Sequence, residues 1–196
     1  MSRADSGGDD CHAKDEGAGA LPDGATTFAE LHGDPANIPR PLAGSIPAFA
    51  DPAWVMSFGE RAAIIGILSQ LRPKISIEIG VALGGSLDAV AAHSGHVHAF
   101  DLFDEPRDLP ANVTYHRGDS HVLLPRILAE LESAGQGIDF ALVDGDHSAV
   151  GVRQDIDDIL QSRAAEHTII LAHDTMNEQV RSGLDAVRYA DYPKVR

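Results

Sequence analysis

The chain has few cysteines, few basic residues and no long apolar run, and each absence excludes a class of protein. Cys11 is the only cysteine, so no intramolecular disulfide can form. Thirty acidic residues against fifteen basic ones give a formal net charge of -15. Because nucleic acids and anionic membranes are bound through clustered Lys and Arg, we expect neither as a partner. No segment approaches the roughly 18 apolar residues of a membrane-spanning helix, and no signal-type segment follows Met1. We therefore expect a cytoplasmic protein without a membrane span.

Composition divides the chain into three parts. Residues 1–24 consist largely of Gly, Asp, Ala and Ser and predict a disordered tail. Residues 25–56 carry repeated prolines and predict an extended arm or lid, with a short helix that opens at the Thr27-x-x-Glu30 capping box. Residues 57–196 predict one folded domain, because apolar periodicity begins there.

Within this domain, helical and strand patterns alternate. A second capping box, Ser57-x-x-Glu60, opens a helix that Pro73 stops. Strand patterns follow at 75–80, 96–101, 113–118, 138–143 and 168–173, and helical patterns at 86–93, 121–133, 149–163 and 177–189. Repeated β-α units predict an α/β fold, a Rossmann-like, doubly wound and mostly parallel sheet. The apolar strands at 140–143 and 168–171 are expected to be buried on both faces.

The first strand runs directly into a glycine-rich turn. Gly80, Gly84 and Gly85 allow the backbone to pass close to a ligand at the point where α/β sheets bind nucleotide-like cofactors. Glu78 precedes the turn, and the turn has no Lys or Arg, so a cationic ligand such as S-adenosylmethionine is favoured over a phosphate. An NAD-type oxidoreductase is the alternative, although Ala82 stands where its fingerprint needs the second glycine.

Acidic residues end all five predicted strands: Glu78, Asp101, Asp119, Asp144 and Asp174. A parallel sheet places these ends on one edge, so we expect the carboxylates to line one crevice. Asp101 is placed to accept the ribose hydroxyls of a nucleoside, and Asp119 with Ser120 to reach its base. Asp119 and Ser120 are equally suited to cap the next helix, and Ser86 is a ligand contact, a turn hydroxyl or a cap.

With these residues in place, the chain resembles the class I S-adenosylmethionine-dependent O-methyltransferases. More narrowly, it resembles the family that includes macrolide-sugar and rhamnosyl O-methyltransferases, over roughly residues 55–196. The motifs that carry the resemblance are Glu78-Ile79-Gly80, Gly84-Gly85-Ser86, Val97-His98-Ala99-Phe100-Asp101, Gly118-Asp119-Ser120, Val143-Asp144-Gly145-Asp146-His147-Ser148 and Ala172-His173-Asp174-Thr175.

The resemblance implies roles for particular residues. The donor S-adenosylmethionine would be held by Glu78, Gly80, Gly84, Gly85, Ser86, Asp101, Asp119, Ser120 and Asp144. A divalent cation, Mg²⁺ or another, would be held by Asp144 and Asp174, with His173 where relatives often have Glu or Asp. His147 matches the position of a general base, Asp144 would orient it, and Asp146 is a secondary candidate. The implied acceptor is a hydroxyl of a small molecule such as a sugar, glycolipid or natural product.

One departure from the family concerns the end of the sequence. Relatives carry two further strands after the last helix, and this sequence stops at Arg196, about where the first would begin. We therefore expect a sheet that lacks the last two strands, with an unpaired edge that favours a homo-oligomer. A truncated, non-catalytic methyltransferase-fold module stays open as an alternative function.

Overall fold

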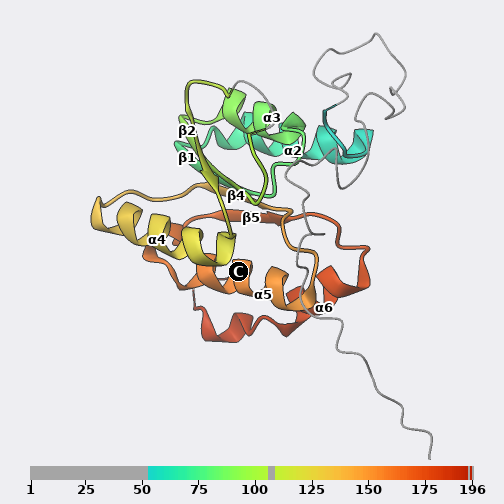
Figure 1. The fold of residues 1–196 in the computed structure, drawn as a ribbon. Coiled ribbons are helices and arrows are strands. Elements are labelled where there is room, and N and C mark those ends of the chain that lie inside the picture. Colours follow the sequence, from blue (N-terminus) through green and yellow to red (C-terminus); the bar gives the residue numbers. More distant parts are fainter. Residues whose placement is uncertain (1–52, 106–108, 194, 196) are drawn as a thin grey trace, which may run out of the picture.

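The computed structural model describes residues 53–105, 109–193 and 195. Five parallel strands pair in the order β3-β2-β1-β4-β5 (Figure 1). The strands are β1 (Ile75–Ile79), β2 (His96–Asp101), β3 (Val113–Arg117), β4 (Phe140–Val143) and β5 (Ile169–Ala172). The helices are α2 (Phe58–Leu71), α3 (Gly85–His93), α4 (Ser120–Ser133), α5 (Ala149–Gln161) and α6 (Glu178–Ala186), with short 3₁₀ turns η3 (Arg163–Ala165) and η4 (Tyr189–Asp191).

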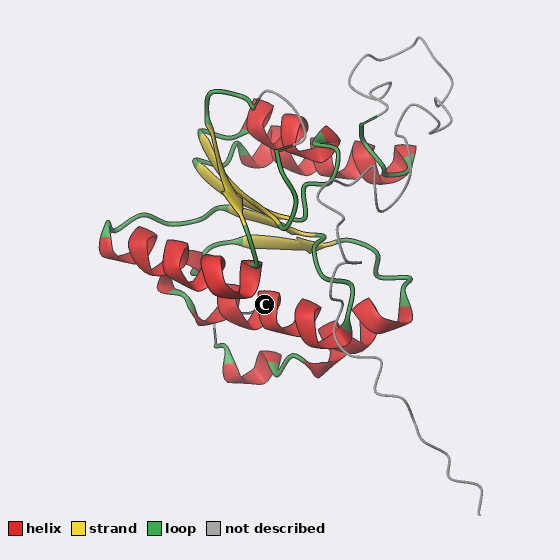
Figure 2. Cartoon of the chain, viewed as in Figure 1, coloured by secondary structure: helices red, strands yellow, loops and turns green. Residues whose placement is uncertain are grey.

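The helices cover both faces of the sheet. Helices α2 and α3 lie on one face, and α4, α5 and α6 on the other (Figure 2). This is the doubly wound α/β arrangement that the sequence predicts. None of the helices in the described ranges is long and apolar enough to cross a membrane.

Local sequence explains where α2 begins and ends. The Ser57 hydroxyl accepts from the Glu60 amide at 3.3 Å, and the Glu60 carboxylate accepts from the Ser57 amide at 2.7 Å, which completes the predicted capping box. The helix ends at Arg72, which is left-handed (φ 49°) and precedes Pro73. The predicted tail at 1–24, the short helix near 27–33 and the arm up to residue 52 lie outside the described residues.

Two apolar layers hold the helices on the sheet. Ile77, Phe100 and Ile159 belong to the layer under α4 and α5, and Leu68 and Leu142 to the layer under α2 and α3. All four residues of β4 are buried, as predicted.

The prediction of burial on both faces is wrong for β5. Ile169 is 44% exposed, and the other residues of the strand are half-buried. The reason is that, among the described residues, β5 is the edge of the sheet and pairs only with β4.

Candidate active site at the carboxyl edge of the sheet

The three glycines after β1 are needed by the packing of the chain itself. Gly80 is left-handed (φ 85°), and a Cβ there would lie 2.0 Å from the carbonyl oxygen of Asp144. Gly84 is left-handed too (φ 82°) and caps α3. A Cβ on Gly85 would lie 2.2 Å from Trp54 Cα. The tight turn is therefore as predicted, but its glycines do not by themselves require a ligand.

Trp54 closes over the start of α3. It is buried, and the guanidinium of the buried Arg61 donates to its carbonyl oxygen and, at 2.9 Å, to that of Met56. The same guanidinium lies 5.6 Å from the centroid of the indole ring. These contacts hold the segment before α2 against Gly85, an arrangement that no sequence pattern indicated.

Glu78 is fully buried beside this turn. The Ser86 hydroxyl donates to its Oε1 at 2.6 Å, while its Oε2 has no hydrogen-bond partner among the described residues. Burial raises the pKa of Glu78 to about 8; the Ser86 hydrogen bond opposes the rise, and the charges of Asp144 and Asp101 add to it. A cation next to this carboxyl group would favour its ionised form.

Asp101 holds the turn after β1 from the end of β2. Its Oδ2 accepts from the amides of Val81 and Ala82 at 2.8 and 2.9 Å, and its Oδ1 accepts from the Phe103 amide at 3.0 Å. The two bonds to the turn fix Ala82 in a left-handed conformation (φ 50°). The predicted contact of Asp101 with a ribose stays a prediction.

The side chains of Asp119 and Ser120 bond to residues of α4 and α5. Asp119 is exposed and accepts from the His121 amide at 2.9 Å as the N-cap of α4. The Ser120 hydroxyl donates at 3.0 Å to Asp155, a buried acid on α5. The alternative of helix capping therefore describes Asp119, and a contact with the donor base stays a prediction for both residues.

Four predicted residues meet where β4 and β5 end. Asp144 Oδ1 lies 3.2 Å from His147 Nε2 and 3.1 Å from His173 Nδ1. Asp174 approaches the same two rings, with Oδ1 3.3 Å from His173 Nδ1 and Oδ2 3.6 Å from His147 Nε2. Asp174 is left-handed (φ 52°), and this conformation begins the turn into α6. Two carboxylates and two imidazoles thus form one cluster.

The charged groups of this cluster shift one another's pKa values toward the ionised forms. Burial would raise the pKa of Asp144, but hydrogen bonds from His147 and His173 outweigh it and leave the pKa lowered. The hydrogen bond to Asp144 raises the pKa of His173 to about 9 against the opposing effect of burial. The same carboxylate is the main cause of a raised pKa at His147. Asp144 is therefore ionised at neutral pH and orients both rings.

Glu60 reaches the cluster from α2. Its Oε1 lies 3.3 Å from His173 Nε2, so that three carboxylates surround the His173 ring, with Asp144 and Asp174 at Nδ1 and Glu60 at Nε2. The capping box identified Glu60 as a residue at a helix start, but nothing in the sequence placed it beside a residue more than a hundred positions later.

The cluster offers the donors of a metal site. One ligand atom each from Asp144, His173 and Asp174 lies within 4.8 Å of the others. Asp146 is not among them, since its carboxylate accepts from the amide and hydroxyl of Ser148 at 2.8 and 2.9 Å. The donor set of two carboxylates and an imidazole fits a divalent cation.

A model of the methyltransferase domain family matches residues 77–175, half of the chain. The chain belongs to this methyltransferase family. The matched range contains every strand-end acid and both histidines of the cluster, whereas Trp54 and Glu60 lie outside it. A search of curated proteins finds no match.

Several solved methyltransferases are similar in structure. The S-adenosylhomocysteine-bound methyltransferase PaMTH1 of Podospora anserina is 15% identical, with a TM-score of 0.50, and the match covers 74% of this chain and 63% of that one. CmcI, described with Mg and S-adenosylmethionine, is 20% identical with a TM-score of 0.48, covering 80% and 70%. CalS11, a TDP-rhamnose 3'-O-methyltransferase, is 14% identical with a TM-score of 0.48, covering 66% and 70%. The PaMTH1 comparison shows a shared fold, and this chain spans less than two thirds of that protein's length.

Proposed function

We propose that this protein transfers a methyl group from S-adenosylmethionine to a hydroxyl of a small molecule. The observation that carries the proposal is the cluster in which Asp144 orients His147 and His173 beside the turn after β1. Membership of the methyltransferase family supports the reaction class. The S-adenosylhomocysteine in the PaMTH1 structure supports the choice of donor.

The surroundings of the turn favour a sulfonium donor over a dinucleotide. In NAD-type enzymes the pyrophosphate lies at the N-terminus of the helix after the turn. Here Trp54 packs against Gly85 at that position, and the Oε2 atom of Glu78 lies buried next to the turn without a partner. With a pKa of about 8, Glu78 holds a proton at neutral pH; a nearby cation would favour its ionised form, whereas a phosphate would oppose it.

Proton removal falls to His147. Methyl transfer is an in-line displacement in which a carbon–sulfur bond breaks, an oxygen–carbon bond forms and the hydroxyl loses its proton. In the tautomer whose Nε2 donates to Asp144, Nδ1 of His147 carries the lone pair that accepts this proton. Asp144 then stabilises the imidazolium, and the half-exposed position of His147 leaves it open to an acceptor.

Asp144, His173 and Asp174 would hold a divalent cation, Mg²⁺ or another. When bound, such an ion lowers the pKa of a nearby hydroxyl as a Lewis acid. The imidazole in the donor set favours a transition metal over Mg²⁺. His173 must be neutral to act as a ligand, so its contacts with Asp144 and Glu60 compete with metal binding.

Calorimetry with S-adenosylhomocysteine tests the donor. We expect the wild-type chain to bind it and Asp101→Asn to bind at least about tenfold more weakly, since the amide cannot hold both turn amides in the same way. Asp185→Asn, at an exposed position of α6, serves as the matched control and should bind like the wild type. A protein that is folded by circular dichroism and binds NADH but not S-adenosylhomocysteine would contradict the proposal.

A further inference from the structure

A second group of histidines lies on the face of the sheet that α4 covers, away from the Asp144 cluster. His96 and His98 come from β2, where alternate residues point to the same face. His116 comes from β3, and its register partner on β2 is Phe100. The proposed methyltransferase reaction uses none of these three histidines.

The ring of His98 contacts both of the other imidazoles. His98 Nδ1 lies 3.0 Å from His116 Nε2. The ring of His96 meets that of His98 edge-on at 4.8 Å, and the ring of Phe100 stacks on His116 at 4.7 Å. The hydroxyl of Thr114 lies 3.1 Å from His96 Nε2. Apolar packing and one hydrogen bond therefore hold His98 and His116 in fixed positions.

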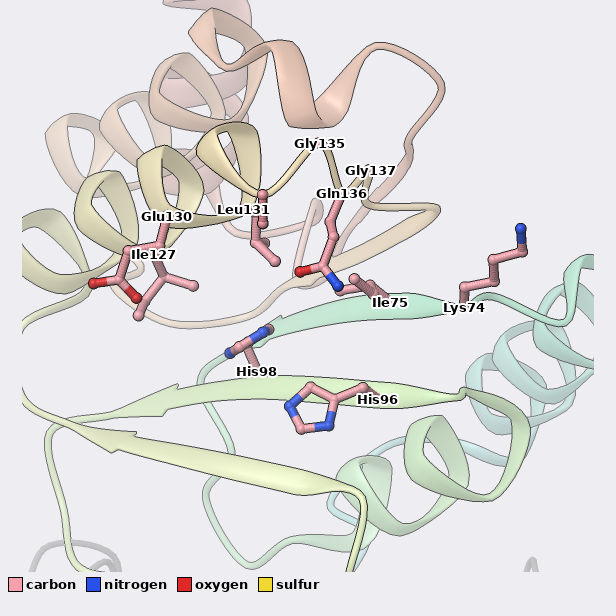
Figure 3. A pocket seen from close by; sticks show the side chains of 11 residues that line it. Lys74, Ile75, His96, His98, Ile127, Glu130, Leu131, Gly135, Gln136 and Gly137 are labelled. Atoms are coloured by element: carbon pink, nitrogen blue, oxygen red, sulfur yellow. The ribbon is translucent and has the colours of Figure 1, made fainter.

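His96 and His98 border a cavity of about 840 Å³ between the sheet and the carboxyl-terminal half of α4. Figure 3 shows the side chains of His96 and His98 on β2, across this space from Leu131 of α4 and from Gln136. Glu130 of α4 borders the same cavity and adds a carboxylate to its lining. Water and small ions therefore have room beside the histidines.

The surroundings favour the neutral forms of His98 and His116. Burial, together with the neighbouring His96 and His116, lowers the pKa of His98 to about 4. Burial is also the main cause of a lowered pKa at His116, to which the charge of Arg126 adds and which Glu130 opposes. A neutral imidazole has a nitrogen lone pair, which is the form that binds metals.

We propose that His98 and His116 bind a transition-metal ion such as Zn²⁺, Cu²⁺ or Ni²⁺, with His96 as the third ligand. Imidazole nitrogens suit these ions. With metal–nitrogen bonds of about 2.0–2.1 Å, neighbouring ligands lie about 2.9 Å apart in square-planar geometry and about 3.4 Å apart in tetrahedral geometry. The observed separation of the two nitrogens, 3.0 Å, falls in this range. In the present rotamers His96 is not within ligand distance of both, so it joins by a side-chain rotation, and water from the cavity fills the remaining position.

Binding requires a tautomer change and no net loss of a proton. In the present pair, one ring donates an N–H to the lone pair of the other. When a metal binds, the donor ring carries its proton on its other nitrogen, and both facing nitrogens bind the ion. The site differs in donor chemistry from the group at Asp144, which offers two carboxylates and one imidazole.

The test is metal titration of the full chain with the carboxylate cluster disabled. Chelator-treated Asp144→Asn/His173→Gln protein is titrated with Zn²⁺ by calorimetry, and with Cu²⁺ by electron paramagnetic resonance. We expect one equivalent to bind, with nitrogen couplings from imidazole in the Cu²⁺ spectrum. Adding His98→Gln should weaken binding by more than the roughly 10–100-fold that loss of an outer hydrogen-bond partner causes. Adding His167→Gln, at an exposed histidine outside the group, should leave it unchanged.

Two results would overturn the proposal. One is the absence of Zn²⁺ uptake by the cluster-disabled protein, and the other is unchanged uptake when His98→Gln is added. If the His98→Gln protein does not fold, judged by circular dichroism, imidazole NMR of the chain without that change decides. Zn²⁺ must then shift the resonances of His98 and His116, and resonances that do not move would refute the site.

Discussion

Asp144 is the residue on which most of the proposed site depends. One oxygen of its carboxylate meets both His147 and His173, and the carbonyl oxygen of the same residue packs against Gly80. A single residue thus fixes the direction of two rings and the position of the turn after β1.

His147→Gln should separate binding from chemistry. Glutamine keeps a polar group beside Asp144 but cannot accept a proton, so we expect S-adenosylhomocysteine to bind as before and turnover to fall about 10²–10⁴-fold. Turnover is measured as release of S-adenosylhomocysteine in the presence of a panel of hydroxyl acceptors, with His167→Gln as the control. Equal turnover in the two variants would remove His147 as the base.

Glu78→Gln should remove part of the dependence of stability on pH. The pKa of Glu78 is raised from 4.5 to about 8 in the folded protein, so between these values the folded state holds a proton that the unfolded state has lost. The contribution of Glu78 is therefore fully present below about pH 4.5 and disappears as pH rises to about 8. The glutamine variant should lose less stability over this range.

Urea unfolding at pH 5 and pH 8 measures this difference, with the exposed Glu178→Gln as the control. If wild type and Glu78→Gln lose the same stability between the two pH values, Glu78 does not titrate as the structure indicates.

At the scale of elements, replacement of glycine by alanine should have opposite effects on stability at two positions. Gly80→Ala places a methyl group 2.0 Å from the Asp144 carbonyl in a left-handed backbone, so we expect a loss of about 2–4 kcal/mol in the free energy of unfolding. Gly66→Ala lies within α2 with no atom within 4 Å of the added carbon and should stabilise by about 0.5–1 kcal/mol. Thermal and urea unfolding of both variants check the signs. If Gly80→Ala left the free energy of unfolding unchanged, the turn would have to adapt to the added methyl group, against this prediction.

The order and type of the elements could be predicted from the sequence because each has a local cause. Ser57, Ser148 and Asn177 cap helices through their own side chains, and apolar periodicity identifies the faces that pack. The observed boundary of an element differs from the predicted one where a side chain beside it bonds to a residue distant in the sequence. β4 begins at Phe140 rather than at residue 138, and the preceding Asp139 accepts from the Lys74 amide at 2.6 Å.

The site could be predicted only as far as topology allows. A parallel sheet brings strand ends together, so the meeting of Asp144 and Asp174 followed from the strand assignment. The hydrogen-bond partner of each acid could not be predicted, because it depends on how far the side chain reaches. Asp101 bonds to the turn after β1, and Asp119 caps α4. The position of Glu60 beside His173 could not be predicted, since a capping motif indicates only local contacts within the helix start.

At the scale of the whole molecule, β5 forms one of the two outer edges of the described sheet. Among the described residues nothing pairs with it, and Ile169 borders a cavity of about 1120 Å³ with Leu184 and Tyr189. An open strand edge with apolar side chains favours association between chains.

Ile169→Lys should therefore reduce self-association, because a charge on an edge strand disfavours pairing with a second strand. The fraction of dimer or larger species is measured by analytical ultracentrifugation over a range of protein concentrations. Val122→Lys, which introduces the same charge at a 68% exposed position of α4, should leave the distribution unchanged. An equal response of the two variants would point to net charge rather than to this edge.

The close approach of Gly80 to the Asp144 carbonyl has a consequence for engineering. Because the turn after β1 and the loop that carries Asp144 and His147 pack directly on each other there, neither can be reshaped without moving the other. A library intended to redirect the protein to new acceptors would leave this joint intact. It would vary instead exposed apolar side chains within three positions of cluster residues in the sequence, namely Phe58, Val150 and Met176, which are 64%, 74% and 86% exposed.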